Sequence, residues 1–288
     1  MKVLAIVAST RKTGNSEILA KEMLAALPAA TEKGMLRLAD YHLEPCRACY
    51  ACLPAGNGCV IADDLAVILQ AIREADAIIL ASPVYFLGMN TSLKLLCDRL
   101  ISVLNEGETY AGRRCVVAVP YGVEGWQGYG VEASVSVARF LHLDVVGVLP
   151  VQAANPGETV QPEILRRARE LACRLLPTGA PAAEFAEAAA IRQSTEAADL
   201  VCPACGCGIL RISATGGLRC AICGATGNLR EAPTGAAVKL QPVWPAMEHF
   251  RYSAAGMAEH AQRLEAIKAD FMRRRHEFLA LRKPYRND

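Results

Sequence analysis

The sequence has no apolar stretch long enough to cross a membrane. Its longest uninterrupted apolar run, residues 3–8, is far shorter than the ~20 residues that a membrane-spanning helix requires. Met1 and Lys2 lead directly into this run, without the charged segment and cleavage site of a secretory signal. We therefore expect the run to be a first β-strand and the protein to be cytoplasmic.

The chain also lacks a large excess of charge of either sign. Its 31 Lys and Arg residues are balanced by 29 Asp and Glu residues, which leaves a formal net charge of +2. Proteins that bind nucleic acid or an anionic membrane through electrostatics usually carry a marked positive excess. We therefore expect neither nucleic acid nor a membrane among the partners.

What is present is typical of a globular protein. Hydrophobic residues make up 52% of the chain, so a wholly disordered protein is excluded and a sizeable core can form. A length of 288 residues suggests about two folded units. Twelve cysteines in a chain without a secretion signal indicate metal ligands or redox groups, because cytosolic thiols are normally kept reduced.

Up to residue 176, short apolar runs alternate with longer amphipathic stretches. This alternation predicts parallel strands joined by crossover helices. The apolar runs predict strands over residues 3–8, 35–38, 77–81, 115–120 and 144–149. The amphipathic stretches predict helices over residues 15–27, 63–75, 90–104, 131–141 and 162–176, with Asp63 and Asn90 as suitable N-caps. Residues 1–176 are therefore predicted to form a doubly wound five-stranded parallel α/β sheet.

The rest of the chain divides into three parts. Residues 177–199 are rich in Ala, Pro, Thr and Glu and predict a linker. Residues 200–231 contain five cysteines but few large apolar residues, so we expect a metal to hold this small unit together. Residues 232–288 form a tail in which a long helix is predicted over residues 253–282, with an interrupted apolar stripe.

The loop between the first predicted strand and the first predicted helix has the features of a phosphate site. A helix N-terminus presents unpaired backbone N–H groups and the positive end of the helix dipole. The candidate phosphate-binding residues are Ser9, Arg11, Thr13, Gly14, Asn15 and Ser16. The loop matches neither the dinucleotide fingerprint nor the P-loop, so the single phosphate of FMN fits it better. The alternative is a capped helix start that binds only water.

Two further loops follow the third and fourth predicted strands. Ligands of open α/β sheets bind in the crevice at the carboxyl ends of the strands. The candidate residues around a flavin ring in this crevice are Pro83, Val84, Tyr85, Phe86, Tyr121 and Gly122. The alternative is that Tyr85 and Phe86 are ordinary core aromatics.

Residues 9–16 together with residues 82–86 resemble the NADPH-dependent FMN reductase family of flavodoxin-like proteins. The resemblance covers residues 1–176 and implies the flavodoxin-like form of the five-stranded sheet. It also implies that the first loop holds the FMN phosphate, whereas the backbone of residues 83–86, with Tyr121 and Gly122, surrounds the isoalloxazine ring.

Four cysteines lie within 14 residues at the spacing Cys-x2-Cys-x2-Cys-x6-Cys. They are Cys46, Cys49, Cys52 and Cys59. Ferredoxins use the first part of this spacing for iron-sulfur clusters, whereas zinc sites favour two separated pairs, so a 4Fe-4S cluster is favoured over zinc or structural thiols. The pattern resembles the archaeal-type iron-sulfur flavoprotein branch of the same family. That branch implies an FMN beside a 4Fe-4S cluster, across a subunit interface.

A second cysteine set consists of two Cys-x2-Cys pairs separated by 14 residues. Its members are Cys202, Cys205, Cys220 and Cys223. This spacing predicts a tetrahedral site, either a zinc ribbon or a rubredoxin-like iron site. Rubredoxins surround their iron with aromatic residues, and residues 200–231 contain none, so zinc is favoured. Cys207 lies between the ligands as a spectator or a substitute ligand.

We predict an electron-transfer oxidoreductase that moves electrons between NAD(P)H or a ferredoxin, FMN and a 4Fe-4S cluster, and on to a small-molecule or protein acceptor. No side chain stands out as a catalytic acid or base. One alternative is an NAD(P)H-dependent reductase of FMN, quinones or nitro compounds, with zinc or structural cysteines. Another is a non-enzymatic redox sensor or adaptor. In each case we expect a homo-oligomer, a dimer or a tetramer.

Overall fold

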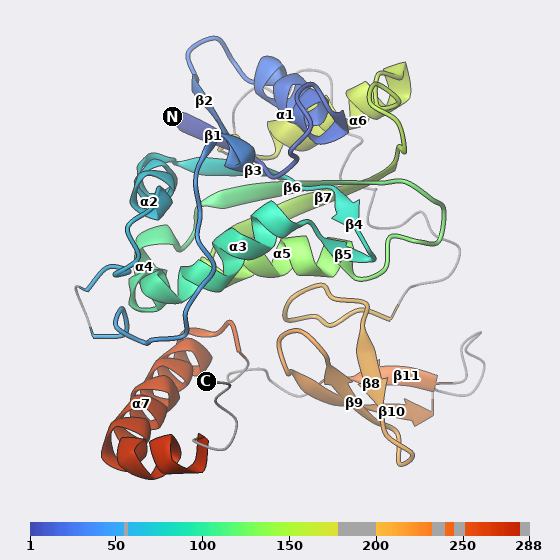
Figure 1. The fold of residues 1–288 in the computed structure, drawn as a ribbon. Helices are drawn as coiled ribbons and strands as arrows, with labels where there is room; N and C mark the ends of the chain where they lie inside the picture. The colour runs from blue at the N-terminus through green and yellow to red at the C-terminus, as the bar shows by residue number, and fades with distance from the viewer. Residues whose placement is uncertain (55–56, 178–199, 232–239, 245–250, 283–288) are drawn as a thin grey trace.

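The computed structural model describes residues 1–54, 57–177, 200–231, 240–244 and 251–282 (Figure 1). Its N-terminal part is a five-stranded parallel sheet with the strand order β2-β1-β3-β6-β7. The strands are β1 (Lys2–Val7), β2 (Glu32–Arg37), β3 (Ala77–Ala81), β6 (Arg114–Tyr121) and β7 (Asp144–Gln152). This order confirms the predicted flavodoxin-like α/β fold.

Helices cover both faces of the sheet (Figure 1). On one face lie α1 (Asn15–Ala26) and α6 (Pro162–Cys173), and on the other lie α2 (Leu65–Glu74), α3 (Thr91–Arg99) and α5 (Gly130–Phe140). Successive residues of β3 enter opposite cores, Ile78 and Leu80 on the α2 side and Ile79 on the α1 side. The continuous apolar runs in the sequence therefore reflect strands that are buried on both faces.

Shorter elements interrupt this pattern at the strand ends. The hairpin of β4 (Val84–Tyr85) and β5 (Gly88–Met89) follows β3. The predicted helix over residues 90–104 ends as an α-helix at Arg99 and continues as the 3₁₀-helix η2 (Leu100–Glu106), followed by α4 (Gly107–Tyr110). A further 3₁₀-helix, η1 (Leu38–Asp40), follows β2.

The two suggested N-caps have different outcomes. The side chain of Asn90 accepts a hydrogen bond from the N–H of Leu93 at 3.2 Å and caps α3, as predicted. The cap position of α2 is Asp64, one residue later than predicted, and the Asp64 side chain makes no capping hydrogen bond. The carboxylate of Asp63 nevertheless accepts a hydrogen bond from the N–H of Leu65, the first residue of α2, at 3.1 Å, and it also pairs with Arg99.

The C-terminal part contains a four-stranded antiparallel sheet with the order β11-β10-β9-β8. Its strands are β8 (Leu210–Ile212), β9 (Gly217–Cys220), β10 (Thr226–Glu231) and β11 (Leu240–Val243). The last strand lies beyond residue 231, where the sequence pattern placed the end of this unit. We call residues 200–244 the four-cysteine module. Nearly all of the predicted linker, residues 178–199, lies outside the described residues.

The last element is the long helix α7 (Ala254–Arg282). Its Met257 and Leu264 are buried against Leu53 and Leu104, so the helix packs on the loop of residues 46–59 and on η2 (Figure 1). We call residues 46–59 the cysteine loop. Among the described residues, no helix combines the length and the apolar character that a membrane span needs.

Candidate flavin site and cysteine centres

A cavity of ≈ 130 Å³ opens at the carboxyl ends of β1, β3, β6 and β7. Its lining residues are Ser9, Arg11, Gly14, Asn15, Ser16, Pro83, Val84, Tyr85, Pro120, Tyr121, Gly122, Ala153, Ala154 and Pro156. The three loops that the sequence singles out therefore meet at one cavity. The loop after β7 also contributes, although no motif in the sequence indicated it.

The first turn of α1 offers a suitable environment for a phosphate. The hydroxyl of Ser16 is buried and has no hydrogen-bond partner among the described residues. At Gly14, the N-cap of α1, a Cβ atom would lie only 3.1 Å from the Cβ of Arg11 and 3.2 Å from its carbonyl oxygen. An unpaired buried donor beside free backbone N–H groups is the environment that a bound anion satisfies. These residues fit the phosphate of FMN.

A buried ion pair between Glu17 and Arg37 stabilises this loop, and no sequence pattern indicated it. Glu17 Oε2 lies 3.2 Å from Arg37 Nε and accepts a hydrogen bond from the N–H of Thr13, which adopts a left-handed φ of 54°. Arg37 Nη2 donates to the carbonyl oxygen of Thr10 at 3.5 Å. Burial opposes ionisation of Glu17, but hydrogen bonds from Lys21 and Thr13 more than offset it, so the pKa of Glu17 is lowered. The pair holds both halves of the loop in place.

Two of the predicted flavin contacts do not line the cavity, and a third, Asn15, lines it while its side chain binds the loop after β7. The Nδ2 of Asn15 donates to the carbonyl oxygen of Ala153 at 3.1 Å, and its Oδ1 accepts from the N–H of Gly157 at 3.0 Å. This side chain therefore joins the loop after β7 to α1. Thr13 and Phe86 do not line the cavity. Phe86 is fully exposed, so its interpretation as a core aromatic is wrong.

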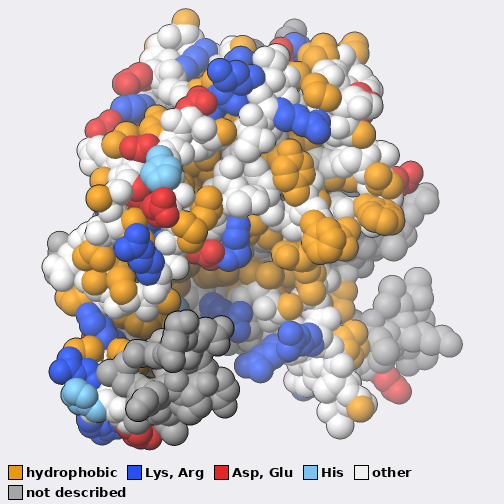
Figure 2. All heavy atoms as spheres, in the orientation of Figure 1, with side chains coloured by type: hydrophobic (Ala, Val, Ile, Leu, Met, Phe, Trp, Pro, Cys, Tyr) orange, Lys and Arg blue, Asp and Glu red, His pale blue; other side chains and the backbone are white. Residues whose placement is uncertain are grey.

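Exposed apolar side chains gather beside this cavity around the β4–β5 hairpin (Figure 2). We call Tyr85, Phe86, Leu87, Trp126 and Tyr129 the aromatic face; each is at least 43% exposed. The N–H of Tyr129 donates to the carbonyl oxygen of Leu87 at 2.8 Å, which joins the two loops that carry these residues. Contiguous exposed apolar side chains of this kind are typical of a binding surface.

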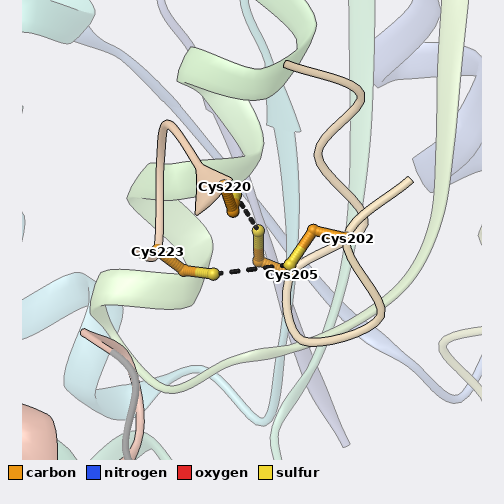
Figure 3. Close-up of side chains that lie close together, drawn as sticks. All are labelled: Cys202, Cys205, Cys220 and Cys223. Atoms are coloured by element: carbon orange, nitrogen blue, oxygen red, sulfur yellow. Dashed lines mark hydrogen bonds between the residues drawn. The ribbon is translucent and has the colours of Figure 1, made fainter. Parts of the chain in front are cut away.

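The second cysteine set converges on one point (Figure 3). The sulfurs of Cys202, Cys205, Cys220 and Cys223 all lie within 4.8 Å of one another, with 3.5 Å between Cys202 and Cys223 and 3.6 Å between Cys205 and Cys220. Four thiolates at ~2.3 Å from one tetrahedral ion are about 3.8 Å apart. The set therefore fits a single metal ion. Burial raises the pKa of the Cys202 thiol to about 11, so a metal must displace its proton.

Aromatic residues do pack against this second site, contrary to the expectation from residues 200–231. Trp244 and Tyr252 contact the buried cysteines, and both lie outside that range. The absence of aromatics is therefore no longer a reason to favour zinc over iron. Cys207 is buried but does not belong to the set of four, and its Sγ accepts a hydrogen bond from the N–H of Ile209 at 3.2 Å.

The cysteine loop has a different geometry. Cys46, Cys49, Cys52 and Cys59 all line one cavity of ≈ 140 Å³. In this described part of the chain, no three of their sulfurs all lie within 4.8 Å of one another. In a 4Fe-4S cluster each thiolate binds a different iron, so its ligands stand farther apart than those of a single ion. The sulfurs of this loop therefore surround a cavity and do not converge on one point as those of the second set do.

The backbone of the cysteine loop is locally strained. Ala48 and Tyr50, on either side of Cys49, have left-handed φ angles of 48° and 53°. Non-glycine residues rarely adopt this conformation, and such strain is concentrated at functional sites. Burial, together with the nearby Cys59 thiolate, raises the pKa of Cys52. His42, four residues before Cys46, is exposed; its Nε2 lies 2.9 Å from Glu44 Oε1, and it does not line the cavity.

A flavodoxin-like sheet with a polar cavity at the carboxyl ends of its strands is an arrangement that binds FMN in flavodoxins. Residues 1–156 match the family model of the NADPH-dependent FMN reductases. The chain belongs to this family.

Three curated relatives of this chain are iron-sulfur flavoproteins. The chain is 46% identical over 103 residues to an iron-sulfur flavoprotein of Methanocaldococcus jannaschii, a match that covers 34% of this chain and 51% of the relative. It is 31% identical over 186 residues to an iron-sulfur flavoprotein of Archaeoglobus fulgidus, which covers 61% of this chain and 79% of the relative. With an iron-sulfur flavoprotein of Methanosarcina thermophila the identity is 36%, over 50% of this chain and 74% of the relative. The chain thus spans about half the length of the first relative.

One solved structure shares the fold over almost the whole chain. A flavone reductase superposes with a TM-score of 0.72 and 19% identity, over 99% of this chain and 96% of its own. The fold shared with that protein therefore extends beyond the flavodoxin-like sheet into the C-terminal part.

Proposed function

We propose that this protein is an electron-transferring iron-sulfur flavoprotein. FMN occupies the cavity at the carboxyl ends of the strands, and a 4Fe-4S cluster occupies the cysteine loop. Electrons come from NAD(P)H or a ferredoxin and go to a small-molecule or protein acceptor. The observation that carries the proposal is the single cavity lined by all four cysteines of the loop, in a chain of the FMN reductase family.

The chain's contribution at the flavin site is binding and electrostatics. The Ser16 hydroxyl and the backbone N–H groups of the first turn of α1 bind the phosphate, and Arg11 neutralises part of its charge. Residues 83–85 and 120–122 hold the ring. When bound, FMN supplies the conversion between two-electron and one-electron transfer. No carboxylate or imidazole is among the lining residues described, so we assign any proton exchange at the ring to solvent.

At the cysteine loop the four thiolates hold the cluster, which when bound supplies one-electron storage. The cavity is otherwise mostly apolar, with Tyr50, Ile61 and Ile101 among its lining residues. α7 packs over the loop, and its Lys268 Nζ donates to the carbonyl oxygen of Tyr50 at 3.0 Å. These contacts hold the loop backbone at Tyr50, beside the buried Cys52, whereas Cys49 stays exposed.

The flavin and cluster cavities share no lining residue. Figure 1 shows the hairpin beside the flavin cavity on one side of the molecule and the cysteine loop, next to α7, on the other. We therefore assign electron exchange to the FMN of one copy and the cluster of another in a homo-oligomer. The exposed aromatic face at the flavin cavity supports such an assembly.

The aromatic face also supports a second candidate, a reductase of planar aromatic acceptors. A planar acceptor would pack on Tyr85 and Phe86 beside the flavin cavity. The whole-chain fold similarity to a flavone reductase is compatible with a conjugated ketone as this acceptor. In this case bound FMN would supply two-electron transfer to the acceptor, and the cysteine loop would be dispensable for the reaction.

Anaerobic purification with FMN, iron and zinc supplied tests both candidates. We expect FMN, iron and acid-labile sulfide in the wild-type protein, and loss of sulfide but not of FMN in Cys49→Ala. Reduction of a one-electron acceptor should fail in that variant. Zinc in both cysteine sets with no sulfide would exclude the iron-sulfur proposal. Unchanged reduction of flavones, quinones or nitro compounds by Cys49→Ala would favour the second candidate.

A further inference from the structure

A buried arginine lies against the cavity of the cysteine loop. Arg99, the last residue of α3, is completely buried and lines the same cavity as the four cysteines. Its Nη2 donates a hydrogen bond to the Sγ of Cys59 at 3.2 Å. Its Nε is buried too and has no hydrogen-bond partner among the described residues. The positive charge of Arg99 and its N–H groups therefore lie at the cavity that the four thiols line.

The protein holds this guanidinium in place from both ends of the cysteine loop. Arg99 Nη1 pairs with Asp63 Oδ2 at 2.6 Å and donates to the carbonyl oxygen of Glu44 at 2.6 Å. Asp63 in turn accepts hydrogen bonds from the N–H groups of Glu44 at 2.9 Å and Leu65 at 3.1 Å. Glu44 precedes the cysteine loop and Asp63 follows it. The pair therefore closes the loop and orients the guanidinium.

Closing the loop accounts for only part of this arrangement. Asp63 accepts from both Nη1 and Nη2, the latter at 3.2 Å, and Glu44 accepts from Nη1. Nη2 also donates to the sulfur of Cys59, and Nε has no partner among the described residues. Leaving a buried donor without an acceptor is destabilising. A cluster in the cavity would bring sulfur atoms, which accept hydrogen bonds, to this side of the guanidinium.

We propose that Arg99 sets the reduction potential of the cluster in the cysteine loop. The inference rests on the proposed function, in that the loop must hold a 4Fe-4S cluster. Each electron added to a thiolate-ligated cluster increases its negative charge. Hydrogen bonds to the sulfurs and a nearby positive charge favour the reduced form and raise the potential. Arg99 is thus a positioning residue that acts through Cys59, and Asp63 moderates its charge.

Arg99→Lys is the primary test. Lysine keeps a positive charge for Asp63 but loses the rigid fork that reaches Cys59. In an electron paramagnetic resonance redox titration of the anaerobic protein, we expect the reduced-to-oxidised ratio of the cluster at a fixed potential to fall about tenfold, a shift of about 59 mV to more negative potential. Iron and sulfide content and the FMN potential should not change. The matched control is Arg113→Lys, since Arg113 binds the carbonyl oxygens of residues 72, 73 and 75 and lines neither cavity.

Asp63→Asn is the second test, and it gives a result even if Arg99→Lys fails to fold. Removing the carboxylate leaves the guanidinium uncompensated, so the cluster potential should become more positive, opposite to Arg99→Lys. A purely structural role predicts no such opposite shifts. An unchanged potential in a loaded Arg99→Lys protein, or a shift of the same sign in both variants, would overturn the inference. Wild-type protein without sulfide would instead overturn the proposed function.

Discussion

Charged residues at the flavin cavity have two separate roles. Arg11 is exposed, lines the cavity, and has no side-chain partner among the contacts described. Glu17 is buried in the first turn of α1 and pairs with Arg37 and Lys21. Replacing an exposed cation such as Arg11 costs little folding stability, whereas removing a buried, paired carboxylate such as Glu17 lowers stability. Substitutions at the two positions should therefore affect binding and stability separately.

Arg11→Ala should weaken FMN binding with little effect on stability. A charge-assisted contact to a phosphate is worth roughly 1.5–3 kcal/mol, so we expect the Kd to rise about 10- to 150-fold. Titration of FMN into the apoprotein, followed by flavin fluorescence, measures the change. Lys12→Ala is the control, because Lys12 is also exposed but does not line the cavity. Equal affinities of the wild type and Arg11→Ala would remove Arg11 from the phosphate site.

Glu17→Gln should destabilise the apoprotein in a pH-dependent way. Because the pKa of Glu17 is lowered from its ordinary value of 4.5, its ionised form adds stability above that value, and this stability is lost as the pH falls through the folded pKa. We expect a loss of about 1–3 kcal/mol at pH 7, since the variant removes one of the two carboxylates that pair with the buried Arg37 and leaves only Asp40.

Urea unfolding at a series of pH values tests this prediction. The difference between the wild type and Glu17→Gln should stay constant from neutral pH down to about pH 5 and shrink below about pH 4.5. Glu22→Gln is the control on the same helix, because Glu22 pairs with the half-exposed Arg169 and should contribute little. A difference that persists unchanged at low pH would show that the charge of Glu17 is not responsible.

At the scale of elements, a short segment connects the two cysteine centres. The N–H of Arg251 donates to the carbonyl oxygen of Cys223 at 2.8 Å. Tyr252 contacts both the buried cysteines of the four-cysteine module and the apolar cluster around Leu53. The hydroxyl of Ser253 then accepts from the N–H of Gly256 at 3.0 Å at the start of α7. The metal site, α7 and the cysteine loop form one continuous set of contacts.

Loss of the metal from the four-cysteine module should therefore loosen the cysteine loop. Metal binding supplies much of the folding free energy of a small cysteine-rich unit, so Cys220→Ala should lose about one metal equivalent and release Tyr252 and α7. In hydrogen exchange of the full chain, we expect about tenfold faster exchange in α7 and in residues 50–53. FMN affinity should not change, because the flavin cavity receives no residue from this part. Unchanged exchange in α7 would show that the two centres are independent.

At the scale of the whole molecule, a single copy keeps the two proposed redox sites apart. The flavin cavity lies at the carboxyl edge of the sheet, and the cluster cavity lies between the cysteine loop and the helices α3 and η2. The aromatic face next to the flavin cavity remains exposed in the single chain. A second copy can supply both a cover for this face and a cluster near the flavin.

Mixing two defective variants tests this arrangement. Arg11→Glu lacks FMN binding and Cys49→Ala lacks the cluster, so each alone should fail to reduce a one-electron acceptor. If FMN and cluster cooperate across subunits, random reassociation as dimers should restore roughly a quarter of wild-type activity, because half of the dimers are mixed and each has one working pair. Mass spectrometry of the intact oligomers checks that mixing occurred. Mixed oligomers without activity would place both centres of a working pair within one chain.

Much of the fold follows from local sequence patterns. The central strands β1, β3 and β6 occur where continuous apolar runs predict them, because strands buried on both faces have no polar positions. The edge strand β2 begins at Glu32, three residues before the predicted run of residues 35–38, and half of its residues are exposed. Asn90 caps α3 through a local hydrogen bond to Leu93. The spacing of the cysteines also marks both cysteine centres, since ligands for one centre must be close along the chain or arranged in pairs.

Other features depend on contacts between distant parts of the chain. The pairs Glu17–Arg37 and Asp63–Arg99 each join residues of different elements, and no periodicity marks them. The loop after β7 reaches the flavin cavity only because β7 pairs in parallel with β6. Trp244 and Tyr252 reach the second cysteine set from outside the predicted unit.

The sequence by itself determined the strands, the helices and the positions of the thiols, because apolar periodicity, capping and ligand spacing act between residues that are near one another along the chain. Only the tertiary structure decided which charges face the two cavities and how far apart the sulfurs stand. A buried charge must find its partner wherever packing brings one within reach, and that depends on the arrangement of the whole sheet and its helices. The spread of the sulfurs around a cavity in one set, and their convergence on a point in the other, is likewise a property of folded loops.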